Sequence, residues 1–204
     1  MSTYKEMQDK IALDYLNQTT LIPETKRAIT SAIRCYEGRR FWFNETQSTV
    51  ALVASQTYLS VPSDFLFLDR LEVTSSGKSS RLDQTTFDAI RNMNLDGTTG
   101  VPTSFAYRGD RFALGVAPDS AYAATVYYIH SLPTLSADSD TNAWTTEAFN
   151  LIVHAAALDL MTGVLQVSDS QKIRYHSNAV TMALTELHLR TENRFSFRIT
   201  PTKF

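Results

Sequence analysis

Helical spacing of apolar residues marks the start of the chain. Thr3 and Glu6 have the spacing of a capping box, and apolar residues follow them at four-residue steps. After a short polar break, Pro23 stands where the first residue of a second helix is expected. The pattern therefore predicts two amphipathic helices within residues 1–40.

The helical spacing ends at residue 41, and from there to about residue 132 the chain is rich in aromatic and β-branched residues. Residues 57–61 alternate between polar and apolar, as half-buried strands do. Glycine-containing stretches at 75–78 and 108–110 predict tight turns between antiparallel strands. One short helix, for which Asp83 is the expected cap, interrupts the predicted strands.

Helical spacing returns at about residue 145. The helix predicted over 145–165 is apolar on nearly all sides, with His154 among its few polar residues, and this indicates burial on most faces. Ser168 and Asp169 predict the cap of a last helix that runs to about Glu192. Within it a seven-residue repeat of apolar residues is carried by Ile173, Val180, Leu184 and Leu187.

The order of these elements predicts an α+β fold. Neither helical pair is large enough to be stable alone, so an α-helical bundle built from the N- and C-terminal helices, with an inserted antiparallel β lobe, is the simplest arrangement. An extended C-terminal arm follows, because the last residues alternate apolar with polar. The expected domains are 1–40 with 145–192 for the bundle, 41–144 for the β-rich lobe and 193–204 for the arm.

Composition narrows the class of protein. The chain has 204 residues, of which 43% are hydrophobic, and this suffices for a real core. Its one cysteine, Cys35, excludes an internal disulfide and a multi-thiolate metal site. No apolar run reaches the ~20 residues that a membrane span needs, so we expect no membrane partner. Residues 171–204 carry a net charge of +4 and the remainder −6, which marks the C-terminal part as a candidate interaction segment.

Motifs for catalysis and cofactor binding are missing from the sequence. It contains no Gly-x-Gly, no phosphate-binding loop and no nucleophile elbow, and its four histidines lie at least 12 residues apart. Residues 138–142 are similar to the start of a calcium loop, but Ala143 and Phe149 stand where that loop needs glycine and glutamate. We therefore expect no enzyme, no cofactor and no metal site, and interpret His154 as a core histidine whose hydrogen bonds are satisfied.

The arm is the candidate binding site. A ten-residue segment cannot bury three phenylalanines against itself, so it needs another surface, either the chain's own β lobe or another chain. Extended peptides with alternating side chains commonly add a strand to a partner's sheet, and we favour the intermolecular alternative. The candidate partner-binding residues are Arg194, Phe195, Phe197, Arg198, Ile199 and Phe204.

The middle of the chain carries an ordered series of short motifs. They read GVPTSFAYRG at 100–109, FALGVAP at 112–118, ATVYY at 124–128, LPTLS at 132–136 and DTNAW at 140–144, before the apolar helix from Phe149. In order and spacing this series resembles the head-to-tail adaptor (connector) proteins of tailed bacteriophages, particularly of short-tailed phages.

The resemblance implies a structural virion protein. Such proteins form a homo-oligomeric ring, usually a dodecamer, between the capsid portal and the tail nozzle or hub protein, and DNA passes through the channel without specific binding. It also implies that the arm reaches the portal protein, and that the protein is located at the head–tail junction after assembly in the host cytoplasm. The apolar helix at 147–165 and the repeat at 173–187 are the expected faces of the ring contact.

Two other functions stay open at this point. The β lobe, rich in serine, threonine and tyrosine, also fits a carbohydrate-binding or tail-fibre-type module. An enzyme with a scattered site would need a deep pocket that holds two or more histidines or paired carboxylates.

Overall fold

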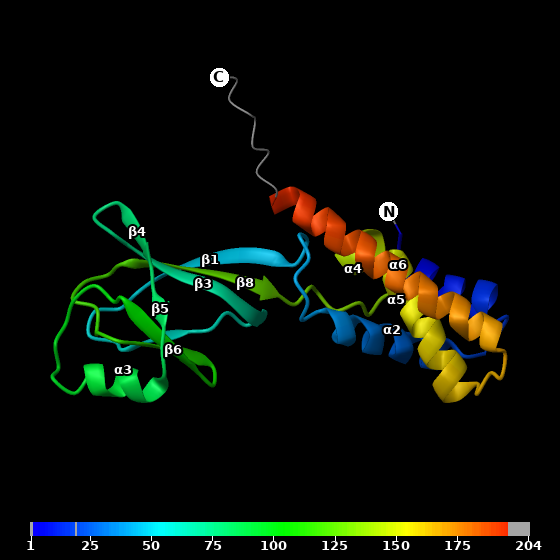
Figure 1. Cartoon of the computed structure of the whole chain (residues 1–204), viewed down its shortest axis with the longest axis horizontal. Helices are drawn as coiled ribbons and strands as arrows, with labels where there is room; N and C mark the ends of the chain where they lie inside the picture. Colours follow the sequence, from blue (N-terminus) through cyan, green and yellow to red (C-terminus); the bar gives the residue numbers. More distant parts are fainter. Residues whose placement is uncertain (1, 19, 196–204) are drawn as a thin grey trace, which may run out of the picture. The chain divides into compact units, whose positions relative to one another are not determined.

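The computed structural model describes residues 2–18 and 20–195, with helices in both end regions and strands between them (Figure 1). The described residues fall into two compact units. The first is formed by the described residues of Met1–Asn44 and Leu132–Phe204, and the second is Glu45–Ser131.

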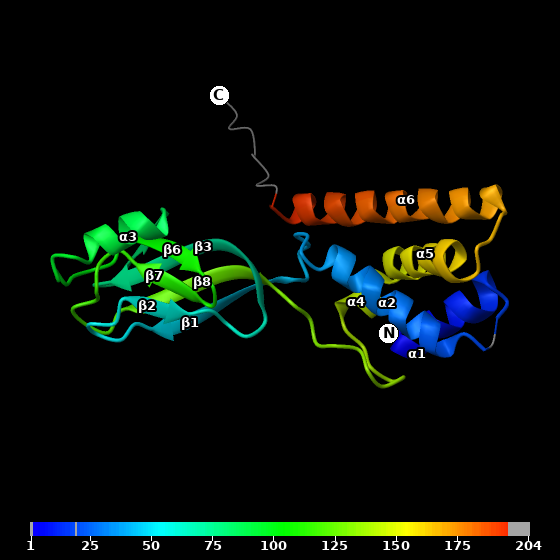
Figure 2. The same cartoon turned by 90° about the horizontal axis from the view of Figure 1, so that it is seen from below.

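The helical unit is built around one central helix. Its elements are α1 (Tyr4–Asp9) with a π-helical continuation η1 (Lys10–Tyr15), α2 (Ile22–Tyr36), α4 (Ala143–Thr146), α5 (Phe149–Asp159) with a π-helical continuation η2 (Leu160–Val164), and α6 (Ser170–Phe195). In Figure 2, α5 lies between α6 on one side and α2 on the other. Leu151, Ile152, Val153 and Ala157 of α5 are all buried, so the predicted burial on most faces is confirmed.

The caps predicted for the first and last helices are confirmed. The Glu6 amide donates to Oγ1 of Thr3 at 3.2 Å, and the Thr3 amide donates back to the Glu6 carboxylate. Oδ1 of Asp169 accepts from the amides of Gln171 and Lys172 at 3.0 and 3.2 Å. These side chains satisfy amides that have no partner inside the helix, which explains where both helices begin.

The helix expected over 145–165 is divided. Asn142 caps the short α4, because its Oδ1 accepts from the Trp144 amide at 2.9 Å, and α5 begins only at Phe149. At the other end of the unit, α6 extends to Phe195, so residues 193–195 of the expected arm are helical. The rest of that arm, 196–204, lies outside the described residues.

The second unit contains two four-stranded sheets. The first has the order β1 (Glu45–Ala51), β8 (Ala123–His130), β3 (Phe65–Ser75) and β4 (Lys78–Arg81). The other has the order β2 (Tyr58–Ser60), β7 (Arg111–Leu114), β6 (Ser104–Arg108) and β5 (Asp83–Gln84). Every pair is antiparallel except β5 with β6. Tight turns at Gly77 and Gly109, with φ of 75° and 63°, join β3 to β4 and β6 to β7 as predicted.

The two sheets share one apolar core. Val73 and Val126 of one sheet and Phe112 and Leu114 of the other belong to a single cluster of buried side chains. The predicted cap of the short helix α3 (Phe87–Met93) is wrong. Asp83 pairs with Ser104 in β5 and β6, so the helix begins later, with Thr86 as its N-cap.

The prediction of a mixed α+β chain is confirmed, since the described residues form six α-helices and two largely antiparallel sheets. Both ends of the expected 41–144 lobe contribute to the helical unit. Phe41 is fully buried there, and Leu132 and Leu135 pack against its core. The domain limits 41–144 for the lobe and 1–40 with 145–192 for the bundle stay a prediction. Within the described residues no helix has the length and apolarity to span a bilayer.

Candidate partner-binding surface

The C-terminal end of α6 lies against an indole ring. The guanidinium carbons of Arg190 and Arg194 are 4.4 and 5.0 Å from the ring centroid of Trp42. The two arginines are one turn apart on the same face of α6, which is why both reach the same ring. At these distances each cation is attracted by the π-electrons of the indole.

A carboxylate fixes the first of these arginines. Nη2 of Arg190 donates to Oε2 of Glu147 at 2.7 Å. Both side chains are partly exposed, so the pair contributes little to stability. It does hold the guanidinium of Arg190 in place over Trp42, between α6 and the end of α4.

An aromatic cluster adjoins Trp42, whose ring meets Phe43 edge-on with centroids 5.2 Å apart. Phe41 meets Trp144 edge-on with ring centroids 5.9 Å apart, and Phe43 meets the same indole at 5.2 Å. The His188 ring packs against Phe41 at 5.6 Å, which ties the cluster to α6. Such edge-to-face pairs in a buried cluster give the site a defined shape.

The backbone that carries the cluster is held by one asparagine. The Asn44 side chain is buried; its Oδ1 accepts from the Phe41 amide at 2.8 Å, and its Nδ2 donates to the carbonyls of Glu37 and Arg39 at 3.2 and 2.7 Å. These three hydrogen bonds fix the turn between α2 and β1. The last turn of α6 therefore rests on a rigid base.

The structure describes two of the six binding residues predicted from the sequence. Arg194 lies on the Trp42 ring, and Phe195 is the last helical residue of α6. The remaining four predicted residues, Phe197, Arg198, Ile199 and Phe204, lie outside the described residues. Trp42 and Arg190 were not predicted, although the sequence Phe41-Trp42-Phe43 is an aromatic signal that could have drawn attention to them.

The two faces expected to form a ring contact lie mostly in the interior of the helical unit. Helix α5 is covered by α2, η1 and α6 of its own unit. Val180 and Leu184 of the seven-residue repeat are packed against the unit's core, and Leu187 is buried in it. Part of each face stays accessible, since Ala155 and Leu158 of α5 and Val180 of the repeat line an open groove, so the expected ring contact stays a prediction.

The histidines on α5 and α6 meet in the interior. His154 Nδ1 and His176 Nδ1 are 2.9 Å apart, and the side chains are 7% and 3% exposed. Burial lowers the pKa of both imidazoles, so both are neutral at pH 7. The hydrogen bond confirms the interpretation of His154 as a satisfied core histidine. Among residues 2–18 and 20–195, no group of three or more His, Cys, Asp or Glu side chains is placed to hold a metal ion.

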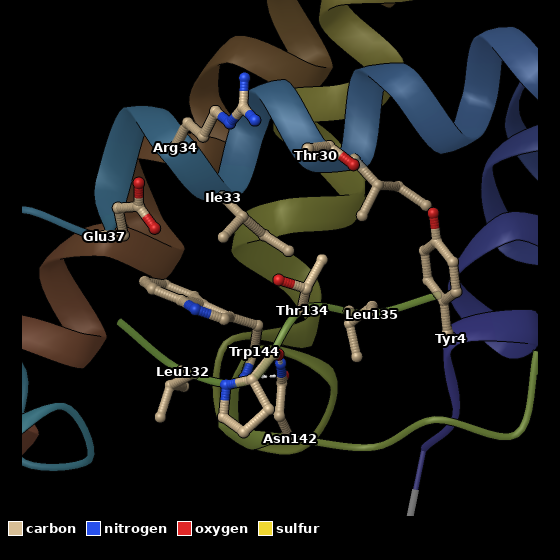
Figure 3. A pocket seen from close by; sticks show the side chains of 12 residues that line it. Tyr4, Thr30, Ile33, Arg34, Glu37, Leu132, Thr134, Leu135, Asn142 and Trp144 are labelled. Carbon is tan, nitrogen blue, oxygen red and sulfur yellow. Dashed lines mark hydrogen bonds between the residues drawn. The ribbon is translucent and has the colours of Figure 1, made fainter. Parts of the chain in front are cut away.

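A small cavity lies between α2 and the loop that follows β8 (Figure 3). Its volume is about 90 Å³, which corresponds to about three water molecules. Ile33 of α2 points toward Trp144 in Figure 3, and Arg34 and Glu37 at the end of that helix also belong to the lining. The lining contains one carboxylate and no histidine, so this cavity does not offer the residues that a scattered catalytic site would need.

A comparison with protein families gives one match for nearly the whole chain. The family model described as SU10 adaptor protein matches residues 2–201. No curated protein matches the sequence.

Proposed function

The chain belongs to the SU10 adaptor protein family, and we propose that it forms a ring that connects the capsid portal to the tail of a short-tailed phage. Members of this family are structural phage proteins and virion components. The match over residues 2–201 is the observation that carries the proposal. In the proposal the ring is twelvefold, continues the DNA channel and is assembled in the host cytoplasm.

The proposed arrangement assigns a role to each part of the chain. The helices near both ends form a bundle that packs side by side around the ring, and the β-rich segment is an inserted lobe. The portal protein binds on one side of the ring and the tail nozzle or hub protein on the other. The near-neutral net charge of −2 supports a channel that DNA crosses without specific binding.

Portal binding is assigned to the C-terminal arm. The arm begins where Arg190 and Arg194 lie on Trp42, so its first residues leave a rigid base. Phe197, Ile199 and Phe204 supply apolar anchors, and Arg198 supplies a charge beside them. In this mechanism the protein acts by assembly and not by catalysis, and the bound ring presents a platform to the next tail protein.

A binding comparison tests the proposal. Purified full-length chain is mixed with assembled portal of the same phage, and bound protein is separated by sedimentation. Saturable co-sedimentation supports the adaptor role. Failure to bind portal, together with binding to glycans on an array, contradicts it and favours a carbohydrate-binding or tail-fibre-type module.

A further inference from the structure

Helix α6 carries a second, partly exposed apolar stripe beside α5, where Tyr175 packs on the His154 ring and Met182 and Leu189 line a groove with Asn150. Tyr175, Met182 and Leu189 follow one another at seven-residue steps and are 59%, 74% and 54% exposed. The core-facing stripe, which includes Val180 and Leu187, lies on the opposite side. A helix that is apolar on two opposite sides is typical of a helix covered on both.

Charged residues are nearly absent from this outer stripe. Between and beside its apolar residues lie Asn178, Ala179, Thr185 and Glu186, so within the described helix the stripe carries one charge. Exposed helix faces are normally rich in Lys, Arg, Asp and Glu. Tyrosine, methionine and a depletion of charge are typical of the centre of a protein interface.

An apolar groove lies on a different side of the same unit. It is bounded by α2, α5 and α6, has a volume of about 320 Å³, and includes Tyr36, Ala155, Leu158 and Val180 in its lining. Val180 is two residues from Met182 and therefore about 200° away from it around α6. Stripe and groove are thus separate faces, and one copy can offer both at the same time.

The charges of the two faces are complementary. Glu186 is the charge on the stripe, and the α2 side next to the groove carries the exposed Arg34, whereas Arg27 already pairs with Glu24 of its own helix. The groove contains Asp159, and the N-terminal margin of the stripe carries Arg174. Pairs of opposite sign at an interface orient the partners and disfavour other pairings.

We propose that the α6 stripe of one copy packs into the α2–α5–α6 groove of a second copy. The contact joins two different faces, so each added copy leaves one stripe and one groove free, and the arrangement repeats until a ring closes. This inference rests on the proposed ring and names the surfaces through which its subunits meet.

The chain's own cysteine provides the test. Cys35 is exposed and lines the groove, and the sequence has no other cysteine. Thr185→Cys places a second thiol beside Met182 on the stripe. After treatment with a short bis-maleimide, this variant should give a ladder of dimers, trimers and larger species on a denaturing gel. The wild type, which has the groove thiol alone, and Thr185→Cys/Cys35→Ser, which has the stripe thiol alone, should give no ladder.

Light scattering separates this inference from the proposed function. If light scattering shows oligomers but cross-linking gives no ladder, the stripe-to-groove contact is wrong while the proposed ring is unaffected. Efficient cross-linked dimers of Thr185→Cys/Cys35→Ser would likewise contradict the contact. Protein that stays monomeric at every concentration would also contradict the contact. The adaptor role is tested separately, by portal binding. Met182→Asp should weaken self-association at least about tenfold. Leu95→Asp, which adds the same charge at a 72% exposed position of the β unit, should leave it unchanged; equal effects would contradict the inference.

Discussion

His154 and His176 share a hydrogen bond between their Nδ1 atoms, which lie 2.9 Å apart. One ring must therefore donate and the other accept, and the accepting imidazole must be neutral. The groups around the pair do not favour a positive charge: the rings of Tyr15 and Tyr175 pack against it, and Lys10 lies beyond Tyr15. Burial first, and then the charge of Lys10, lowers the pKa of His154; burial and then His154 lower that of His176.

Acid should destabilise the helical unit through this pair. Both pKa values lie below the ordinary 6.5, so the unfolded chain binds more protons than the folded chain as the pH falls. The stability that the neutral histidine pair contributes is complete above about pH 6.5 and is lost as the pH falls toward the lowered pKa values of the folded state. Thermal unfolding followed by circular dichroism from about pH 8 to about pH 5 measures it.

A variant separates this effect from other titrating groups. His176→Gln removes one of the two imidazoles, so its stability should change less between these pH values than that of the wild type. His130→Gln is the control, since His130 lies beside Asp64 in the β unit. Equal acid sensitivity of His176→Gln and the wild type would show that the pair does not set the response.

Removing the indole under α6 should loosen the end of that helix. Trp42→Ala takes away the ring that Arg190 and Arg194 cover, and half-buried aromatic area with it. We expect the free energy of unfolding to fall by about 2 kcal/mol. Trp42→Phe should lose only part of that stability. In Trp42→Ala, hydrogen exchange should be faster for the amides of residues 187–195. Unchanged exchange there in Trp42→Ala would refute the role of the ring as a support.

Deletion of residues 196–204 should remove portal binding without unfolding the chain. The deletion ends at Phe195, the last residue of α6, so the aromatic base and the core of the helical unit are retained. Circular dichroism should show the helical content of the parent, and sedimentation with portal should show no bound protein. Full affinity in the truncated chain would mean that the arm does not hold the portal.

One glycine tests whether the two compact units unfold separately. A Cβ at Gly115 would overlap Oγ of Ser104 and lie 3.1 Å from Sδ of Met93, so Gly115→Ala should destabilise the β unit by about 1–3 kcal/mol. Gly100→Ala, where the nearest atom is 3.9 Å away, is the matched control. Calorimetry should show a lowered transition for the β unit and an unchanged one for the helical unit. A single transition that shifts as a whole would show that the units unfold together.

Local signals between neighbouring residues predict most of the secondary structure. The capping box of Thr3 and Glu6, the cap at Asp169 and the turns at Gly77 and Gly109 depend on neighbours within a few residues, and all were predicted. Asp83 was misread because its strand partner, Ser104, lies far along the chain.

The site depends on contacts that a single sequence does not contain. Trp42 meets Arg190 and Arg194 across about 150 residues, and no periodicity links those positions. The apolar character of α5 predicted burial correctly, but only the packing shows which elements, α2, η1 and α6, lie against it. The outer stripe of α6 was hidden because the core-facing repeat in the same helix has the same seven-residue period.

Imaging of the chain bound to its portal tests the central claim most directly. Full-length protein is mixed with assembled portal and viewed along the channel axis by negative-stain electron microscopy. The account predicts twelvefold rings that cap one end of the portal and leave the channel open. Portals without a cap, with the chain dispersed as single particles, would contradict it.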